Sequence, residues 1–354
     1  MQDTELMKSQ FIDNLKFFGS LLVMSYHATG ILGLPTLWGG GTAYYIQKYG
    51  WLPVELFFWS SGYFMHLKYS GQIKEEKICF NEYIKKRLRK IYPIYFISLL
   101  IAIFMRGFLY KERIITFWDL IVNILTLNTG VFYIDGNEWR NDIGWATWYI
   151  GVLVILYILF YYINKLIRDK DNKTFVYLLL VIIGINGMGV GNSFLYNFYV
   201  QRGVVGFFSG ALIALQFNEC RLSNTKVKNI CYIGFTFSLV MFLETLHQQQ
   251  LGNAKIIAIF DCVLMPLLFI VVQNCVWLGK LLNLRCVKNA GALSTYIYFF
   301  HYPLLMVYSR ALRMFGLKTG YWSVYIGLAI CMIIISEMCI KIEKHVYNHV
   351  TGKK

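Results

Sequence analysis

Long runs of apolar residues alternate with short polar connections along almost the whole chain, from residue 14 to residue 341. Each run has about 17 to 22 residues, the length that a helix needs to cross the ~30 Å hydrocarbon core of a bilayer. The pattern predicts an all-α, polytopic transmembrane bundle of about ten spans. The predicted spans are residues 14–34, 51–67, 91–108, 144–164, 174–191, 200–217, 229–246, 255–275, 292–312 and 321–341.

An eleventh apolar stretch, residues 117–133, is less uniform than the others. It is interrupted by Asp119, Asn123, Asn128 and Gly130, so hydropathy alone leaves open whether it crosses the membrane. If it crosses, every basic connection that follows it changes sides.

The distribution of Lys and Arg favours ten crossings. With ten, the basic connections and both termini share one side, which carries 23 Lys and Arg residues against 10 on the other, while Lys16 lies inside the first span. Loops rich in Lys and Arg stay in the cytoplasm. We therefore expect cytoplasmic termini, an external segment 109–143, and a re-entrant or interfacial helix at 117–133.

Composition excludes an ordinary soluble protein. Hydrophobic residues make up 57% of the 354, charged residues only 15%, and the mean hydropathy is +0.50. The net charge of +15 follows from the predicted topology and suits contact with anionic membrane lipids, so nucleic-acid binding is not needed to explain it. We expect one membrane domain over residues 1–354, in the cell membrane, with no appended soluble domain.

Two histidines lie deep inside predicted spans. His27 is about 13 residues from the cytoplasmic start of the first span, and His301 is about 9 from that of the ninth. At about 1.5 Å per residue, both reach mid-membrane. Ionisable groups at this depth are costly and mark functional sites, although each imidazole could instead only bond a neighbouring helix. The matching depth favours a base and its partner.

Lys16 precedes His27 by 11 residues. Three helical turns place the two on nearly one face, with the cation nearer the cytoplasm. This arrangement indicates a substrate path that runs from Lys16 towards His27.

Other polar groups at depth are Glu55, near the outer start of the second span, and Asp261 in the eighth. Glu55 could pair with a His or a Lys, whereas Asp261 has no evident partner in the sequence.

A basic segment, KKRLRKIYP at 85–93, precedes the third span. Arg87 and Lys90, at i and i+3, share a helix face and could hold a phosphate together. The same charges could instead serve only to fix the topology.

Four motifs occur in order along the chain. The first is the Lys16 to His27 spacing in LKFFGSLLVMSYH, and the third is Arg87 to Pro93, with Lys90 at the position of a second Arg. The second motif consists of Glu55, Phe57, Phe58, Ser61, Gly62 and Tyr63. The fourth is GALSTYIYFFHYP, which contains Ser294, Tyr296, Tyr298 and His301, and Glu343 follows it.

Together these motifs resemble the acyltransferase 3 family of membrane proteins, which O-acylate surface polysaccharides, lipid-linked sugars and related acceptors. Two positions depart from the family pattern. Leu153 stands where many members have a Glu, and Lys90 cannot reproduce the bidentate fork of an Arg.

The resemblance implies an acyltransferase that moves an acyl group, acetyl being expected, from cytoplasmic acyl-CoA to a hydroxyl of a sugar-containing acceptor. We expect Lys16, Arg87 and Lys90 to bind the donor. We expect His27 to act as general base or acyl carrier, with His301 or Glu55 orienting it or donating to the oxyanion. No metal is expected.

The acceptor is expected to enter from the other side of the membrane, near Glu138, Arg140, Asp142, Trp145 and Trp148. The alternative function is a transporter or flippase of a lipid-linked saccharide, which would use the same buried polar groups as a path. A membrane assembly subunit with a degenerate site is a third possibility.

Overall fold

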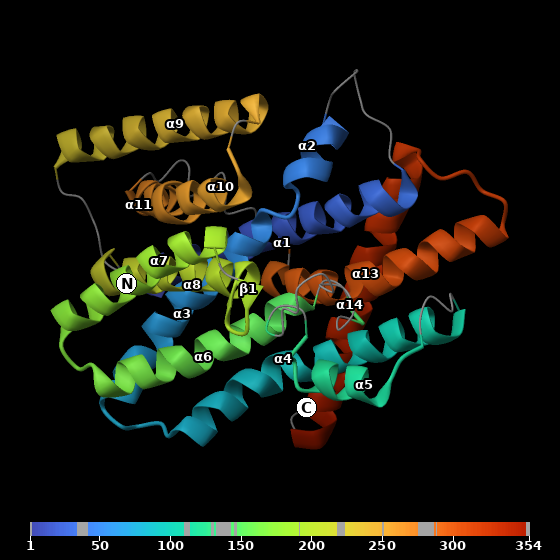
Figure 1. The fold of residues 1–354 in the computed structure, drawn as a ribbon, viewed down its shortest axis with the longest axis horizontal. Helices are drawn as coiled ribbons and strands as arrows, with labels where there is room; N and C mark the ends of the chain where they lie inside the picture. Colours follow the sequence, from blue (N-terminus) through green and yellow to red (C-terminus); the bar gives the residue numbers. More distant parts are fainter. Residues whose placement is uncertain are drawn as a thin grey trace.

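The chain folds into a helical bundle, which confirms the predicted all-α class (Figure 1). The computed structural model describes residues 2–33, 42–109, 114–128, 131, 143–144, 147–190, 192–217, 224–249, 251–274, 287 and 289–351. Within these residues, the only extended pairing is a hairpin of two-residue strands, β1 (Asn192–Ser193) and β2 (Tyr196–Asn197).

The first half of the chain forms α1 (Gln2–Leu32), α2 (Thr42–Tyr49), α3 (Pro53–Lys74), α4 (Phe80–Ile103), the π-helical turn η1 (Phe104–Leu109), α5 (Phe117–Ile124) and α6 (Trp148–Leu166). The second half forms α7 (Lys170–Val190), α8 (Phe198–Phe217), α9 (Thr225–Gln248), α10 (Asn253–Ile259), the π-helical turn η2 (Phe260–Leu264), α11 (Met265–Asn274), α13 (Ala290–Met314) and α14 (Trp322–Thr351).

Eight helical segments of the described chain are long and apolar enough to cross a membrane. They are Gln10–Leu32, Phe80–Gly107, Trp148–Leu166, Lys170–Gly189, Phe198–Phe217, Thr225–Gln248, Asn253–Asn274 and Trp322–His345. The protein is therefore a multi-pass membrane protein.

Two further predicted spans coincide with long helices of lower hydropathy. Helix α3 has 22 residues and α13 has 25, both long enough to span, but α3 contains Glu55 and α13 contains His301 among other polar residues. The total of ten crossings and the cytoplasmic termini remain predictions.

The stretch 117–133 forms no continuous span over its described residues. Helix α5 has eight residues, about 12 Å of rise, and Thr126 in the turn after it has a φ of +58°. The polar residues that interrupt the apolar run stabilise this short helix. Asp119 forms a capping box with Thr116, and Asn123 accepts a hydrogen bond from the backbone N–H of Ile143 and, through its carbonyl, another from Tyr95.

Helices α3 and α8 form the closest contact at the centre of the bundle. A Cβ added at Gly62 would lie 1.8 Å from the carbonyl oxygen of Phe207, and one at Gly210 would lie 1.9 Å from that of Trp59. Small residues permit this approach between membrane helices. The contact fixes α3, which carries Glu55, against α8.

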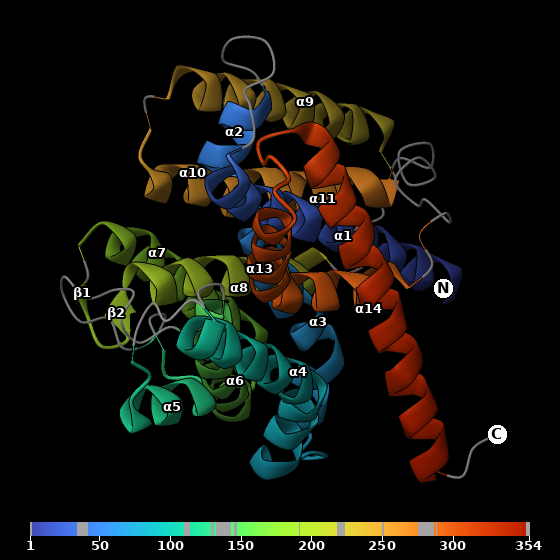
Figure 2. The ribbon, with the colours of Figure 1, turned by 90° about the vertical axis from the view of Figure 1, so that its right-hand side faces the viewer.

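Helix α9 lies at the periphery, beyond α10 and α11, in both views (Figures 1 and 2). Phe242 is its one buried residue among those described, whereas Ile230, Ile233 and Phe237 are largely exposed. An exposed apolar surface of this extent fits contact with the hydrocarbon of a membrane.

Candidate functional site

A cleft of about 540 Å³ opens between α1, α3, α4, α6 and α13. The three predicted donor-binding cations, Lys16, Arg87 and Lys90, all line this cleft, although they come from two helices. We call it the donor cleft after that prediction. Lys68 of α3 and the carboxylate of Asp13 also line it. Four cations and one acid therefore surround the opening, which suits a polyanionic ligand.

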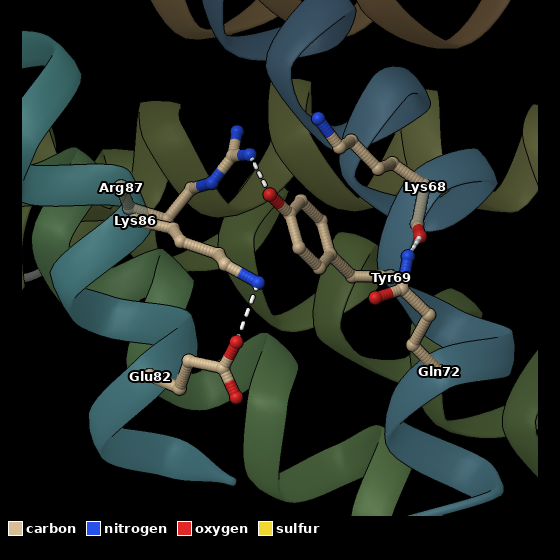
Figure 3. Close-up of polar contacts among 6 residues, drawn as sticks. All are labelled: Lys68, Tyr69, Gln72, Glu82, Lys86 and Arg87. Carbon is tan, nitrogen blue, oxygen red and sulfur yellow. Dashed lines mark hydrogen bonds and ion pairs between the residues drawn. The ribbon is translucent and has the colours of Figure 1, made fainter. Parts of the chain in front are cut away.

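Arg87 is positioned by a tyrosine. Its Nη2 donates a hydrogen bond to the Tyr69 hydroxyl, and its guanidinium carbon lies 4.3 Å from the centre of the Tyr69 ring. Figure 3 shows Arg87 extending from α4 towards Tyr69 of α3, whereas Lys86 turns to Glu82 and bonds it at 2.6 Å. Of the five cations in segment 85–93, the cleft is lined by Arg87 and Lys90.

Lys68 is a cleft residue that the sequence alone did not identify. It lies directly after the predicted second span, where its charge was counted with those that set topology. Its side chain is exposed, and in Figure 3 its ammonium group and the Arg87 guanidinium both lie towards the top of the view, reached from opposite sides. One signal could have found it: Lys68 is close in sequence to the Ser61 to Tyr63 motif and faces the same end of the bundle as Lys16.

Aromatic rings form the deep end of the cleft. Tyr298 of α13 packs edge-on against Phe57 of α3 and Tyr149 of α6, with ring centres 5.3 and 5.4 Å apart. Leu153 lies in the same wall. A ligand that enters past the cations thus meets apolar and aromatic surface, which suits an uncharged arm or acyl group.

The two predicted histidines lie together beyond this aromatic wall. The ring centres of His27 and His301 are 5.2 Å apart, with their planes tilted by 30°. Tyr302 packs edge-on against His27 at 5.5 Å. Helices α1 and α13 thus bring two bases into contact from positions 274 residues apart in the sequence.

The fully buried imidazole of His301 has a defined orientation. Its Nδ1 lies 2.6 Å from the carbonyl oxygen of Tyr298. A carbonyl can only accept, so Nδ1 carries the hydrogen, and in the neutral ring Nε2 then has a free lone pair. This Nε2 is buried and has no hydrogen-bond partner among the described residues. An unpaired buried acceptor next to a second imidazole is suited to proton transfer.

Pro303 leaves one backbone carbonyl of α13 without its helical hydrogen bond. A proline within a helix cannot donate to the carbonyl four residues earlier, which here belongs to Phe299. Ser98 of α4 fills that position, because its Oγ donates to the Phe299 carbonyl at 2.6 Å. The turn that holds His301 is therefore tied to α4.

The donor cleft ends one helical turn before the histidines. Tyr298 and Phe299 line it, and His301 follows within three residues, whereas neither histidine itself lines the cleft. Lys16 lies about 16 Å before His27 along α1. The path from the cations to His27 stays a prediction, because the cleft itself reaches only as far as Tyr298 and Phe299.

Glu55 has a partner that the sequence did not suggest. Its Oε1 accepts hydrogen bonds from Nε of Arg202, at 2.8 Å, and from Nη2 of the same residue, and both side chains are buried. No described contact joins Glu55 to His27 or His301. The guanidinium lies 4.9 Å from the ring centres of both Trp51 and Trp148.

Asp261 in η2 belongs to the same charged cluster. A Cβ added at Gly206 would lie 3.2 Å from Asp261 Oδ2 and 3.4 Å from the backbone oxygen of Glu55. Neither carboxylate oxygen of Asp261 has a hydrogen-bond partner among the described residues. Breaking a buried ion pair leaves an uncompensated charge, so this cluster has a strong effect on how α3, α8 and η2 assemble.

Most of the predicted acceptor region lies outside the described residues, namely Glu138, Arg140, Asp142 and Trp145. Trp148 is described, and it packs on Arg202 as stated above. Within the described part of the chain, no group of three or more His, Cys, Asp or Glu side chains is arranged to hold a metal ion.

Comparison with known proteins tests the resemblance that the four motifs indicated. No curated protein and no solved structure gives a significant match to the chain. The family model for an acyltransferase domain, acyltransferase 3, matches residues 9–339, nearly the whole chain, and the protein therefore belongs to this family of membrane acyltransferases.

Proposed function

We propose that the protein transfers an acyl group, acetyl in the simplest case, from acyl-CoA on the cytoplasmic side to a hydroxyl of a sugar-containing acceptor. The acceptor is a surface polysaccharide or its lipid-linked precursor, and the membrane is the cell membrane. One observation carries the proposal: a cleft lined by four cations ends at aromatic rings, one turn from a pair of imidazoles, of which His301 is buried and His27 half-buried.

The cleft supports binding of the donor by its phosphates. Arg87 can bond a phosphate bidentately, whereas Lys16, Lys68 and Lys90 act as point charges around it. The contact with Tyr69 holds the Arg87 guanidinium in place before the donor arrives, which reduces the entropy lost on binding. The uncharged arm of the donor then extends along the aromatic wall towards His27.

The chemistry is assigned to the imidazole pair. In the proposed step, His27 removes the proton from the acceptor hydroxyl, the oxygen forms a bond to the thioester carbonyl carbon, and the carbon–sulfur bond breaks. The proton then passes from His27 to the departing thiolate. The free Nε2 of His301 can accept a hydrogen bond from the protonated His27, so His301 is the positioning residue.

Two parts of the assignment have alternatives. His27 could first carry the acyl group itself, which would be followed by attack of the hydroxyl on the acyl-imidazole. Glu55 was the other expected partner of His27. Its ion pair with Arg202 instead supports a role in holding α3 against α8, on the side from which the acceptor is expected to enter.

The test is a transfer assay on purified His27→Ala with radiolabelled acetyl-CoA. Loss of a general base lowers the rate by about 10²- to 10⁴-fold, whereas His345→Ala, which changes an exposed histidine, leaves it unchanged. Coenzyme A binding by His27→Ala serves as the folding control. Undiminished transfer by a variant that still binds coenzyme A ends the proposal.

A second measurement separates transfer from transport. Arg87→Ala should weaken coenzyme A binding by about tenfold or more, because it removes a charge-assisted contact. Donor-independent flux of a lipid-linked saccharide, with no coenzyme A binding, would identify a transporter instead.

A further inference from the structure

A second cavity, of about 650 Å³, lies on the other side of α1 and α3 from the donor cleft. It is bounded by α1, α2, α3, α9 and the start of η2, and its walls are almost entirely apolar. Leu15 and Leu22 of α1 face it, as do Leu56 of α3 and Leu243 of α9. We call it the apolar groove.

Two walls of the groove, α1 and α9, are helices long and apolar enough to cross a membrane. One wall is α9, whose outer surface is apolar and exposed, and another is the predicted first span. Leu15 and Leu22 are seven residues apart, so the groove follows α1 for at least about 10 Å. A groove of this length and chemistry in a membrane is suited to an extended hydrocarbon chain.

One end of the groove is polar. The Tyr45 hydroxyl and the His247 Nδ1 are 2.5 Å apart there, and both residues line the groove. Lys48, on the next turn of α2, donates to the Gln249 side chain. No carboxylate pairs with Lys48 among the residues described, so its charge is available to an anion.

The polar end lies on the predicted outer side of the membrane. Helix α2 follows the outer end of the first span, and His247 follows the outer end of the seventh. The end therefore faces the side where the acceptor is expected, and the groove follows the helices that carry His27 and Glu55. A lipid-linked acceptor whose sugar reaches His27 would lie beside α1 and α3, the helices that bound the groove.

We propose that the apolar groove binds the hydrocarbon chain of a lipid-linked acceptor, a polyprenyl phosphate carrying the sugar, with its phosphate next to Lys48. The assignment rests on the proposed transfer reaction for the acceptor's identity. The binding itself can be measured without any transfer.

The probe is a polyprenyl monophosphate with a photoreactive group on its chain, added to the purified protein in lipid vesicles. Crosslinks mapped by mass spectrometry are expected on α1 near Leu22 and on α9 near Leu243. Excess phosphatidylglycerol should not displace the probe. Equal displacement by phosphatidylglycerol, or crosslinks confined to other helices, overturns the proposal.

Variants locate the chain and the phosphate separately. Leu22→Trp combined with Leu243→Trp narrows the groove and should reduce labelling by about tenfold, the effect of removing roughly 1.4 kcal/mol of binding. The matched control combines Met241→Trp with Ile326→Trp, which add the same bulk at exposed positions outside the groove, and should label like the wild type. Equal labelling of both double variants overturns the proposal.

Lys48→Gln keeps the groove intact and tests the headgroup, so it also covers the case in which the tryptophan variants fail to fold. It should reduce labelling by polyprenyl phosphate about fivefold, since one Lys near an anionic headgroup contributes about 1 kcal/mol, but should leave labelling by the uncharged polyprenol unchanged. An equal effect on both probes overturns the assignment of the phosphate to Lys48. Specific labelling without transfer would refute the proposed function alone, and transfer without labelling would refute this inference alone.

Discussion

Gly62→Ala should destabilise the protein strongly, because a single added methyl group would separate α3 from α8. The added Cβ would lie 1.8 Å from the Phe207 carbonyl oxygen, and ordinary contact begins at 3.4 Å. The two backbones would therefore have to move apart by about 1.6 Å. The obstacle is a backbone atom, so no side-chain rotation can relieve it.

The expected cost is about 3 kcal/mol, at the upper end for overpacking a tight contact. For a chain of 354 residues, with an unfolding entropy of about 2.1 cal/mol/K per residue, that corresponds to a melting temperature lower by about 4 °C. The Glu55–Arg202 ion pair lies about two helical turns from this contact, so a separation of α3 from α8 should also weaken that pair.

The assay is thermal unfolding of the purified variant in detergent, followed by size exclusion and tryptophan fluorescence. Gly71→Ala is the matched control, because it lies in the same helix and a Cβ there meets nothing within 4 Å. Gly71→Ala should melt at or slightly above the wild-type temperature, since Ala favours a helix over Gly. If the two variants melt at the same temperature, the contact does not restrain the bundle as argued.

Two further predictions follow from the ion pair and from the donor cleft. Tyr69→Phe should weaken coenzyme A binding about three- to tenfold, because it frees the Arg87 side chain. Isothermal titration measures this, with Tyr162→Phe as the control that should bind like the wild type. Equal affinities of the two variants would refute the positioning role of Tyr69. Arg202→Gln should lower the free energy of unfolding by about 3–5 kcal/mol, because it leaves the Glu55 charge buried without its partner. The double variant Glu55→Gln/Arg202→Gln should lower it by less. If the effects in this double-mutant cycle are additive, the two charges do not interact.

The positions of the long helices and the pairing of the histidines followed from residue counting. An α-helix rises by a constant amount per residue, so distance from a span's start gives depth, and His27 and His301 indeed lie side by side. The same counting gives Arg202 and Glu55 similar depths, because both lie just inside the predicted outer ends of their spans, at 200 and 51. Depth alone does not show that the two side chains pair.

Other features depend on which helices lie side by side, and the depth of a residue in the membrane does not predict this. Helices α3 and α13 are less apolar than a typical span because they carry polar site residues, and their burial among other helices compensates. Lys68 lies beside the donor cleft only because α3 packs next to α4. The hydrogen bond from Ser98 could not be predicted, since nothing in the sequence tells which helix faces the carbonyl that Pro303 leaves free.

That hydrogen bond gives α4 two roles in one element. Near its start, α4 presents Arg87 and Lys90 to the cleft, and further along it holds the Phe299 carbonyl through Ser98. A displacement of α4 when a ligand reaches the cations would pull on α13 at the turn before His301. Occupancy of the entrance and alignment of the imidazole would thus be linked through one continuous helix, in which Pro93 lies between the two contacts.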